Sequence, residues 1–181
     1  MTRLPNNQPM PQGVLDLYDS YCHGAMSRRD FFDRLGKYAV GGLSVSMLAA
    51  CVMPDYEGTL QTSADDARLN IETFHYDSPD GAGDMAGDLV RLKKGKTKRP
   101  GVVVVHENRG LNPYIKDVAR RTALEGYIAL APDALYPLGG YPGNDDDGRE
   151  MQATRDRDAM IQDFMAAAEA LRDHPECNGK V

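Results

Sequence analysis

Four consecutive valines, Val102 to Val105, follow Pro100 and Gly101 and constrain the fold more than any other feature of this 181-residue sequence. β-Branched side chains favour extended backbone. A run of them without polar alternation is expected of a strand that is buried on both faces. The valine run therefore predicts a central strand of a sheet that other elements cover from both sides.

Two strand-like segments precede the valine run. The first contains Ile71, Phe74 and Tyr76 and ends at the turn cluster Ser-Pro-Asp-Gly of residues 78–81. Residues 84–93 then carry apolar side chains again and are expected to return as the next strand. This part of the chain predicts two strands joined by a turn.

Helical and strand patterns alternate after the valine run. Asn112 and Pro113 are favoured at a helix N-terminus, and the helix that they open is expected to end at Gly126. The further elements are a second buried strand at residues 127–131, a long helix at about 149–173 and the start of one more strand at Lys180 and Val181. Such alternation predicts an α/β fold, a three-layer α/β/α domain with a mostly parallel sheet.

Ligands bind at the carboxyl ends of the strands in sheets of this kind. Residues 106–112 and the loop of residues 132–150 are therefore expected at the prospective site. That loop is rich in Gly, Pro and Asp, and loops of its length inside a compact domain are usually functional or mobile. Asp145, Asp146 and Asp147 lie near the start of the long helix, where negative charge is favourable.

The N-terminal part of the chain resembles an export signal. Arg28 and Arg29 precede two phenylalanines, and a short apolar run rich in Gly and Ser follows from Tyr38 to Ala50. This pattern resembles a bacterial twin-arginine signal, which a receptor reads as an address. The residues Leu-Ala-Ala-Cys that end at Cys51 also resemble a lipoprotein processing site, at which Cys51 becomes the lipidated first residue.

These patterns predict a leader at residues 1–51, a linker at 52–69 and the folded domain at 70–181. The expected location is outside the cytoplasm, in the periplasm or anchored to a membrane through Cys51. The alternative is a cytoplasmic protein in which Phe31, Phe32 and Leu35 form the apolar face of a short helix packed on the domain.

Charge and cysteine spacing exclude several classes of function. The net charge is −6 and no basic stripe is present, which argues against a nucleic-acid partner. The one basic run, at residues 93–99, is expected to be a solvated loop between strands. Cys22, Cys51 and Cys177 show neither a disulfide framework nor the spacing of zinc ligands. We therefore expect no metal and no other cofactor.

Three ordered stretches resemble the dienelactone hydrolase family of the α/β-hydrolase superfamily. They read VVVVHENRGLNPYIKDVARRTALEGY at residues 102–127, ALAPDALYP at 129–137 and HPECNGKV at 174–181. The resemblance covers about 110 residues and corresponds to the N-terminal half of the family's domain. It implies an α/β-hydrolase fold that hydrolyses a small carboxylic ester or lactone.

The resemblance also assigns candidate site residues. Glu107 is implied to be the acid beside the nucleophile, and Asn108 lends a backbone N–H to the oxyanion hole. A loop just past a buried strand holds such donors rigidly where negative charge develops. Arg149 is a candidate for binding a substrate carboxylate, as an arginine in the corresponding region of the family does, but the local alignment needs a gap and favours a solvated arginine at the start of a helix. His106 is expected to be a hydrogen-bonded residue at the strand end, and Asp133 to fix the following loop.

Family members continue from a sequence like NGKV into a strand and a G-x-C-x-G turn with the cysteine nucleophile, and the triad acid and histidine follow. The printed sequence ends at Val181, and Cys177 precedes that strand. We therefore expect a chain truncated before its nucleophile, inactive alone and marginally stable, whose partner is a separately encoded C-terminal half. The alternatives are a non-catalytic exported binding fragment and the product of a disrupted gene.

Overall fold

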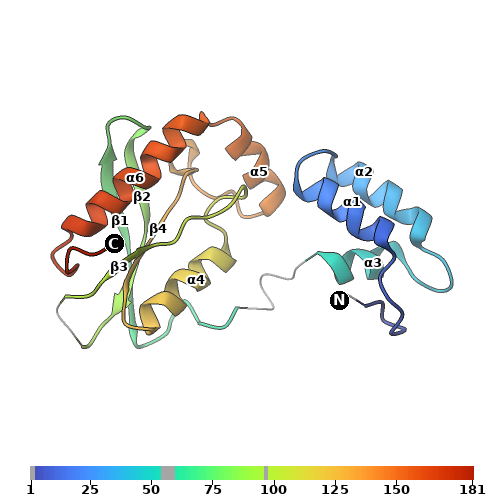
Figure 1. Ribbon diagram of the computed structural model, residues 1–181, viewed down its shortest axis with the longest axis horizontal. Helices are drawn as coiled ribbons and strands as arrows, with labels where there is room; N and C mark the ends of the chain where they lie inside the picture. The colour runs from blue at the N-terminus through green and yellow to red at the C-terminus, as the bar shows by residue number, and fades with distance from the viewer. Residues whose placement is uncertain (1–2, 54–59, 96–97) are drawn as a thin grey trace. The chain divides into compact units, whose positions relative to one another are not determined.

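The computed structural model describes residues 3–53, 60–95 and 98–181, which form two compact units (Figure 1). The first unit comprises Met1–Tyr56 and the second Glu57–Val181. The division falls within the stretch that the sequence indicates as a linker. Part of that linker, residues 54–59, lies outside the described residues.

The first unit is a small helical domain with an apolar core of its own. Its elements are α1 (Gln12–Cys22), α2 (Arg28–Leu35), the 3₁₀ turn η1 (Gly36–Tyr38) and α3 (Val45–Val52). Phe31 is fully buried and stacks on Tyr21 with 5.0 Å between the ring centroids. Leu35 and Leu48 complete the centre of this core, so that α2 and α3 pack against α1.

The expected leader is thus folded into helices in this structure. Phe31 and Leu35 are buried on a short helix and pack within the first unit, whereas the alternative interpretation expects this helix to pack on the domain at residues 70–181. Cys51 lies half-buried near the end of α3. None of the helices in the described part of the chain combines the length and the apolarity needed to cross a bilayer. Export and lipidation stay predictions.

The second unit contains a four-stranded sheet in the order β1-β2-β4-β3. Its strands are β1 (Leu69–Ser78), β2 (Gly83–Leu92), β3 (Gly101–Val103) and β4 (Ile128–Pro132). β1 and β2 form the expected hairpin, in register from Leu69 opposite Leu92 to Ser78 opposite Gly83. β2 also pairs antiparallel with β4, and only β3 pairs parallel with β4. The prediction of a mostly parallel sheet is therefore wrong for the described strands, which form a mixed sheet, because β2 returns through a tight turn and enters between β1 and β4.

Two helices cover the two faces of this sheet, which confirms the three-layer α/β/α architecture. They are α4 (Pro113–Leu124) and α6 (Arg157–Asp173) (Figure 1). Alternate residues of β4 supply the two cores: Ala129 and Ala131 pack under α4, whereas Ile128 and Leu130 pack under α6. All four are fully buried, as expected for a strand without polar alternation.

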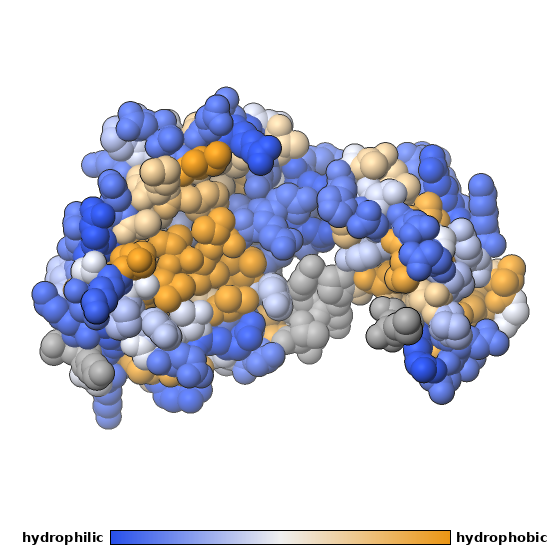
Figure 2. Space-filling view, in the orientation of Figure 1, coloured by the Kyte–Doolittle hydropathy of each residue, from blue (hydrophilic) through white to orange (hydrophobic). Residues whose placement is uncertain are grey.

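The valine run is less buried than the sequence predicts. Regular pairing in β3 ends at Val103, and one further hydrogen bond joins the Val104 N–H to the Leu130 carbonyl at 2.8 Å. Val105 is 52% exposed. The reason is that β3 lies at the end of the strand order, where β4 is its neighbour on one side only. Figure 2 shows apolar side chains gathered over this part of the second unit.

Residues 176–180 run alongside the outer side of β3 at its beginning. The Asn178 N–H donates to the Arg99 carbonyl at 2.8 Å, and the Gly101 N–H donates to the Lys180 carbonyl at 2.7 Å. The bridge between Arg99 and Cys177 is parallel, as expected for the start of one more strand. Arg99 itself is 3% exposed and pairs with Glu176, so it is not part of a solvated basic loop. Of the rest of that run, Lys93, Lys94 and Lys98 are exposed and residues 96–97 lie outside the described residues.

The expected long helix at 149–173 is two helices, α5 (Asp145–Ala153) and α6. The side chains of Asn144 and Asp156 cap their N-termini by accepting from backbone N–H groups. Between the helices, Arg155 turns inward and its guanidinium donates to the Asp163 carboxylate at 2.6 Å. The Asp156 cap begins a new helix directly after Arg155, and the buried Arg155–Asp163 ion pair lies at this break.

The described end of the expected linker belongs to the second unit. The backbone N–H groups of Gln61 and Thr62 donate to the carboxylate of Asp117, at 3.3 Å and 2.8 Å. Asp117 lies on α4 and is 1% exposed, and it also pairs with Arg120 and Arg121. A buried carboxylate needs such partners, so the segment around Thr62 is bound to the domain.

A substitution at Leu171 tests whether the apolar core under α6 stabilises the second unit. Leu171→Ala removes a fully buried side chain and is expected to lower the free energy of unfolding by about 3 kcal/mol. Met165→Ala, at a 57% exposed position of the same helix, is expected to change it by less than about 0.5 kcal/mol. Urea unfolding followed by circular dichroism measures both, and equal effects would contradict the packing of α6 on the sheet.

Candidate functional site

The carboxyl ends of β1, β3 and β4 lie at the same edge of the sheet, because β1 and β4 both run antiparallel to β2 and β3 runs parallel to β4. Glu107 lies four residues beyond the end of β3, at this edge. The loop after β4 begins there as well, with Asp133 and Ala134. The sequence therefore predicts correctly that both segments lie at this edge of the sheet.

His106 joins the two loops at this edge. Its Nε2 accepts a hydrogen bond from the Ala134 N–H at 3.0 Å, and its Nδ1 lies 2.8 Å from the Glu107 carbonyl. The ring is 4% exposed and packs edge-on against Phe164. Burial lowers the pKa of His106, opposed by the hydrogen bond to Glu107 and by the charge of Asp133. His106 is thus a neutral, hydrogen-bonded residue at the strand end, as the sequence indicates.

Glu107 and Asn108 are both exposed. The backbone carbonyl of Glu107 faces the protein, where it also accepts from the side-chain Nε2 of Gln152 at 2.9 Å. The Gln152 Oε1 in turn accepts from the Gly110 N–H at 3.1 Å. One side chain from α5 therefore holds both ends of the loop that carries the two candidate residues.

Asp145 is a second tie between α5 and this loop. Its carboxylate accepts from Arg109 at 3.1 Å, from the Asn112 side chain at 3.2 Å and from the Tyr141 hydroxyl at 2.8 Å. Helix and loop approach so closely that a Cβ on Gly148 would lie 2.3 Å from the Arg109 carbonyl. The sequence indicates Asp145 only as an acid at a helix start, and no local pattern marks Gln152, because the loop residues that they bind lie more than 30 residues away.

Asp133 fixes the loop after β4, as expected. Its two carboxylate oxygens accept from the backbone N–H groups of Leu135 at 2.9 Å and Tyr141 at 3.2 Å. Arg149 lies on α5, one helical turn before Gln152, and is half-buried. Residues three apart are neighbours on a helix surface, so Arg149 shares the side of α5 that reaches the Glu107 loop. Its binding of a substrate stays a prediction.

A buried polar cluster lies at the β1 side of the same edge. Asp163 is fully buried, pairs with Arg155 and accepts from the Ala82 N–H at 2.9 Å. The hydroxyls of Tyr76 and Ser78 are buried without a hydrogen-bond partner among the described residues. Burial raises the pKa of the Tyr76 hydroxyl, and the negative charge of Asp163 raises it further. The ion pair between Arg155 and Asp163 holds this buried cluster together.

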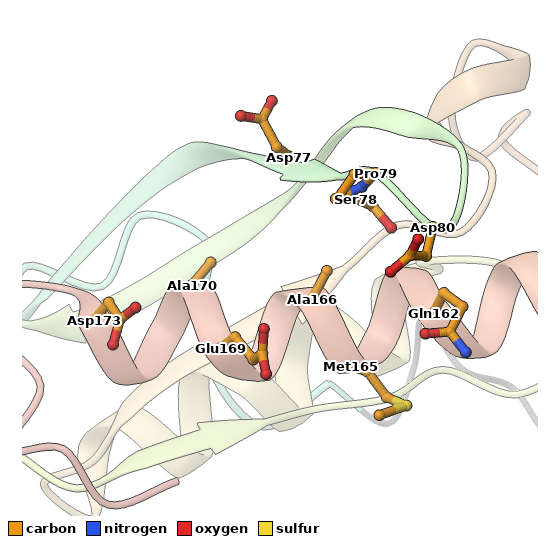
Figure 3. A pocket seen from close by; sticks show the side chains of 10 residues that line it. All are labelled: Asp77, Ser78, Pro79, Asp80, Gln162, Met165, Ala166, Glu169, Ala170 and Asp173. Atoms are coloured by element: carbon orange, nitrogen blue, oxygen red, sulfur yellow. The ribbon is translucent and has the colours of Figure 1, made fainter.

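A groove of about 410 Å³ lies between the β1–β2 turn and α6. Figure 3 shows residues 77–80 on one side of it and side chains of α6 on the other. Because β1 and β3 are at opposite ends of the strand order, this groove is separated from the loop that carries Glu107. It is not part of the candidate site.

Cys177 lies at the wrong end of the sheet to act with Glu107. It is 3% exposed, its thiol donates to the Lys180 carbonyl at 3.8 Å, and it bridges Arg99 at the beginning of β3. Glu107 follows the other end of the same strand. Cys177 is therefore a buried structural residue, as the sequence indicates.

The lowered pKa of His106 makes the free energy of unfolding depend on pH. Its pKa is lowered in the folded state, so the unfolded chain takes up the proton first as the pH falls below about 6.5. The stabilisation is present above that value and is lost as the pH falls toward the pKa of the folded state. Urea unfolding from about pH 7.5 to about pH 5.5 should show a smaller pH dependence in His106→Asn than in the parent chain. If His106→Asn leaves the pH dependence of unfolding unchanged, His106 is not its source. The same holds if the exposed control His75→Asn reduces that pH dependence as much as His106→Asn does.

Two family models match separate parts of the chain. A model described as "YqhI-like" matches residues 1–40, and the model of the "Dienelactone hydrolase family" matches residues 87–181, slightly more than half of the chain. The two matches fall on either side of the division between the units.

Relatives agree with the second match. The "Putative hydrolase fragment YghX" of Escherichia coli (strain K12) is 58% identical over 99 residues, which are 55% of this chain and 85% of that protein. A "Putative carboxymethylenebutenolidase" of Salmonella typhi is 41% identical over 61 residues, 34% of this chain and 23% of that protein. The chain therefore spans most of the first relative and about a quarter of the second.

A solved structure described as a dienelactone hydrolase-like promiscuous phosphotriesterase, P91 from metagenomic libraries, is 32% identical with a TM-score of 0.49. The match covers 62% of this chain and 46% of that one. The match to the family model and the extent of the match to the Escherichia coli protein identify the chain. It belongs to the dienelactone hydrolase family.

Proposed function

We propose that the second unit supplies the acid and the first oxyanion donor of a carboxylic ester or lactone hydrolase. The observation that carries the proposal is the position of Glu107 and Asn108. Both follow β3 at the carboxyl edge of the sheet, in a loop that His106 and Gln152 hold by hydrogen bonds. Membership of a hydrolase family gives this edge its expected chemistry.

The two groups suit thiol-based ester hydrolysis. A carboxylate beside a thiol keeps the thiol neutral until substrate arrives, or accepts its proton. A rigidly held backbone N–H stabilises the negative oxygen that forms when the thiol attacks the carbonyl carbon. Glu107 takes the first role and Asn108 the second. Arg149, on the same side of α5 as Gln152, is the candidate partner for a substrate carboxylate.

The nucleophile, its histidine and the second acid come from polypeptide outside residues 1–181 in this proposal. Support comes from the segment at residues 176–180, which pairs in parallel with residues 99–101 at the beginning of β3. A strand that continues in this direction reaches its carboxyl end beside Glu107, because parallel strands end at the same edge. The source is either a continuation of this chain or a separately encoded C-terminal half.

The substrate class follows from the relatives and is part of the proposal. Several relatives are described as carboxymethylenebutenolidases, whose printed name denotes a lactone substrate. We propose a small ester or lactone for this chain as well, with no nucleic-acid partner and no cofactor. A non-catalytic exported fragment is the alternative, and hydrolysis by a completed site separates the two.

Joining the missing segment to the chain tests the proposal. The full chain is fused at Val181 to the remaining C-terminal segment of the Salmonella typhi relative, and hydrolysis of a chromogenic short-chain ester is measured. The hybrid is expected to turn over the ester, and Glu107→Gln is expected to lower kcat/KM by about 10²–10⁴-fold because the carboxylate is lost. The matched control Glu125→Gln, an exposed acid after α4, should leave the rate unchanged.

The unfused chain serves as the second control. It is expected to show no hydrolysis above buffer. If the unfused chain hydrolyses the ester even after Glu107→Gln and replacement of all three of its cysteines, the site lies elsewhere. A folded hybrid without turnover would favour the non-catalytic alternative.

Export is a separate prediction for residues 1–51. In cells, the mature protein is expected to begin at Cys51 with a lipid on its thiol, which mass spectrometry of the N-terminal peptide detects. Replacing Arg28 and Arg29 by lysine keeps the charge of α2 and should leave the chain unprocessed, because the receptor reads the arginine pair. An intact Met1 on cytosolic protein would contradict the prediction.

A further inference from the structure

The backbone carbonyl of Glu107 receives two hydrogen bonds from side chains of different elements. The His106 ring nitrogen Nδ1 lies 2.8 Å from it, and the Gln152 Nε2 lies 2.9 Å from it. A carbonyl oxygen has two lone pairs, so both acceptor sites are used. Two donors on one oxygen restrict the rotation of the whole peptide group between Glu107 and Asn108.

The hydrogen-bond partner of the Nε2 atom of His106 determines that the Nδ1 atom is the donor. The Ala134 N–H points at the Nε2 of His106 at 3.0 Å, and a backbone N–H can only donate. Nε2 is therefore the acceptor, and the proton of the neutral ring is on Nδ1, where it donates to the Glu107 carbonyl. Burial of the ring lowers the pKa of His106, and this favours the neutral form that can do both. The charged group that acts on the ring from the facing β4 loop is Asp133.

The second donor is oriented in the same way. The Gly110 N–H donates to the Oε1 of Gln152 at 3.1 Å, so the other end of the amide, Nε2, faces the Glu107 carbonyl. Gly110 has φ +81°, a conformation that other residues adopt only with strain, and a Cβ there would lie 2.5 Å from the Leu135 side chain, so this end of the loop favours glycine. The amide of Gln152 thus spans the loop from Glu107 to Gly110.

The direction of the next N–H follows from peptide geometry. A trans peptide group is planar, and its N–H and C=O point in opposite directions. The described residues contain no cis peptide bond. Because the Glu107 carbonyl points toward His106 and Gln152, the Asn108 N–H points away from both. Asn108 itself is exposed.

We propose that His106 and Gln152 are positioning residues that clamp the Glu107–Asn108 peptide and thereby aim the Asn108 N–H at the reacting oxygen. The inference rests on the proposed function for the identity of that oxygen. The clamp itself is a property of this chain and needs no nucleophile. It assigns a role to a buried histidine that is not a catalytic base and to a glutamine on a different element.

Nuclear magnetic resonance of the full-length 181-residue chain, labelled with ¹³C and ¹⁵N, tests the clamp. Gln152→Glu keeps an oxygen for the Gly110 N–H but removes the donor to the Glu107 carbonyl. It is expected to shift the carbonyl ¹³C resonance of Glu107 upfield and to move the Asn108 amide resonance, while Gly110 stays protected from hydrogen exchange. Gln152→Ala removes both bonds and is expected to make Gly110 exchange about tenfold faster. Gln162→Glu on α6 is the matched control and should leave all three residues unchanged.

The ¹⁵N resonances of the His106 ring supply an independent measurement. A protonated Nδ1 and an unprotonated Nε2 are expected near neutral pH. The opposite tautomer, or Glu107 and Asn108 resonances that do not respond to Gln152→Glu, would overturn the clamp. These measurements need no turnover. If they agree and the fused hybrid fails to hydrolyse esters, the clamp holds and the proposed function is wrong.

Discussion

Complete burial of β4 is the constraint on which the second unit depends. Residues 128–131 are fully buried, and their side chains alternate between the two faces of the sheet. Each face must therefore be covered. Small alanines on one face allow α4 to pack closely, and larger side chains fill the space under α6. The hairpin of β1 and β2 completes the arrangement by covering the edge of β4 opposite β3.

Beyond the strand ends, backbone N–H and C=O groups no longer form hydrogen bonds within the sheet. At the candidate site, side chains bind these groups instead. His106 satisfies the N–H of Ala134, Gln152 satisfies Gly110, and Asp133 satisfies Leu135. An unpaired backbone group in a buried position is costly. The bonds that satisfy these groups also fix the shape of the loops, which is what a catalytic edge requires before substrate arrives.

The chain combines two units that are independent in core and in family. The helical unit is organised around Phe31, and the α/β unit around β4. The "YqhI-like" match ends at residue 40 and the dienelactone hydrolase match begins at residue 87. A family assignment for the second unit therefore carries no function for the first, whose arginine pair lies in the first turn of a folded helix.

The sequence by itself determined the α/β class, the positions of the hairpin and of α4, and the edge at which Glu107 and Asn108 lie. These follow from local patterns: uninterrupted apolar strands, the cap at Asn112 with Pro113, and the turn at residues 78–81. Only the tertiary structure decided that the sheet is mixed, that Val105 is exposed, and that the predicted long helix breaks at Arg155. It also decided that Gln152 and Asp145 hold the site loop. The physical reason is that periodicity reports which side of an element is apolar. The partner of a strand edge, a buried charge or a loop carbonyl depends on residues far away in the chain.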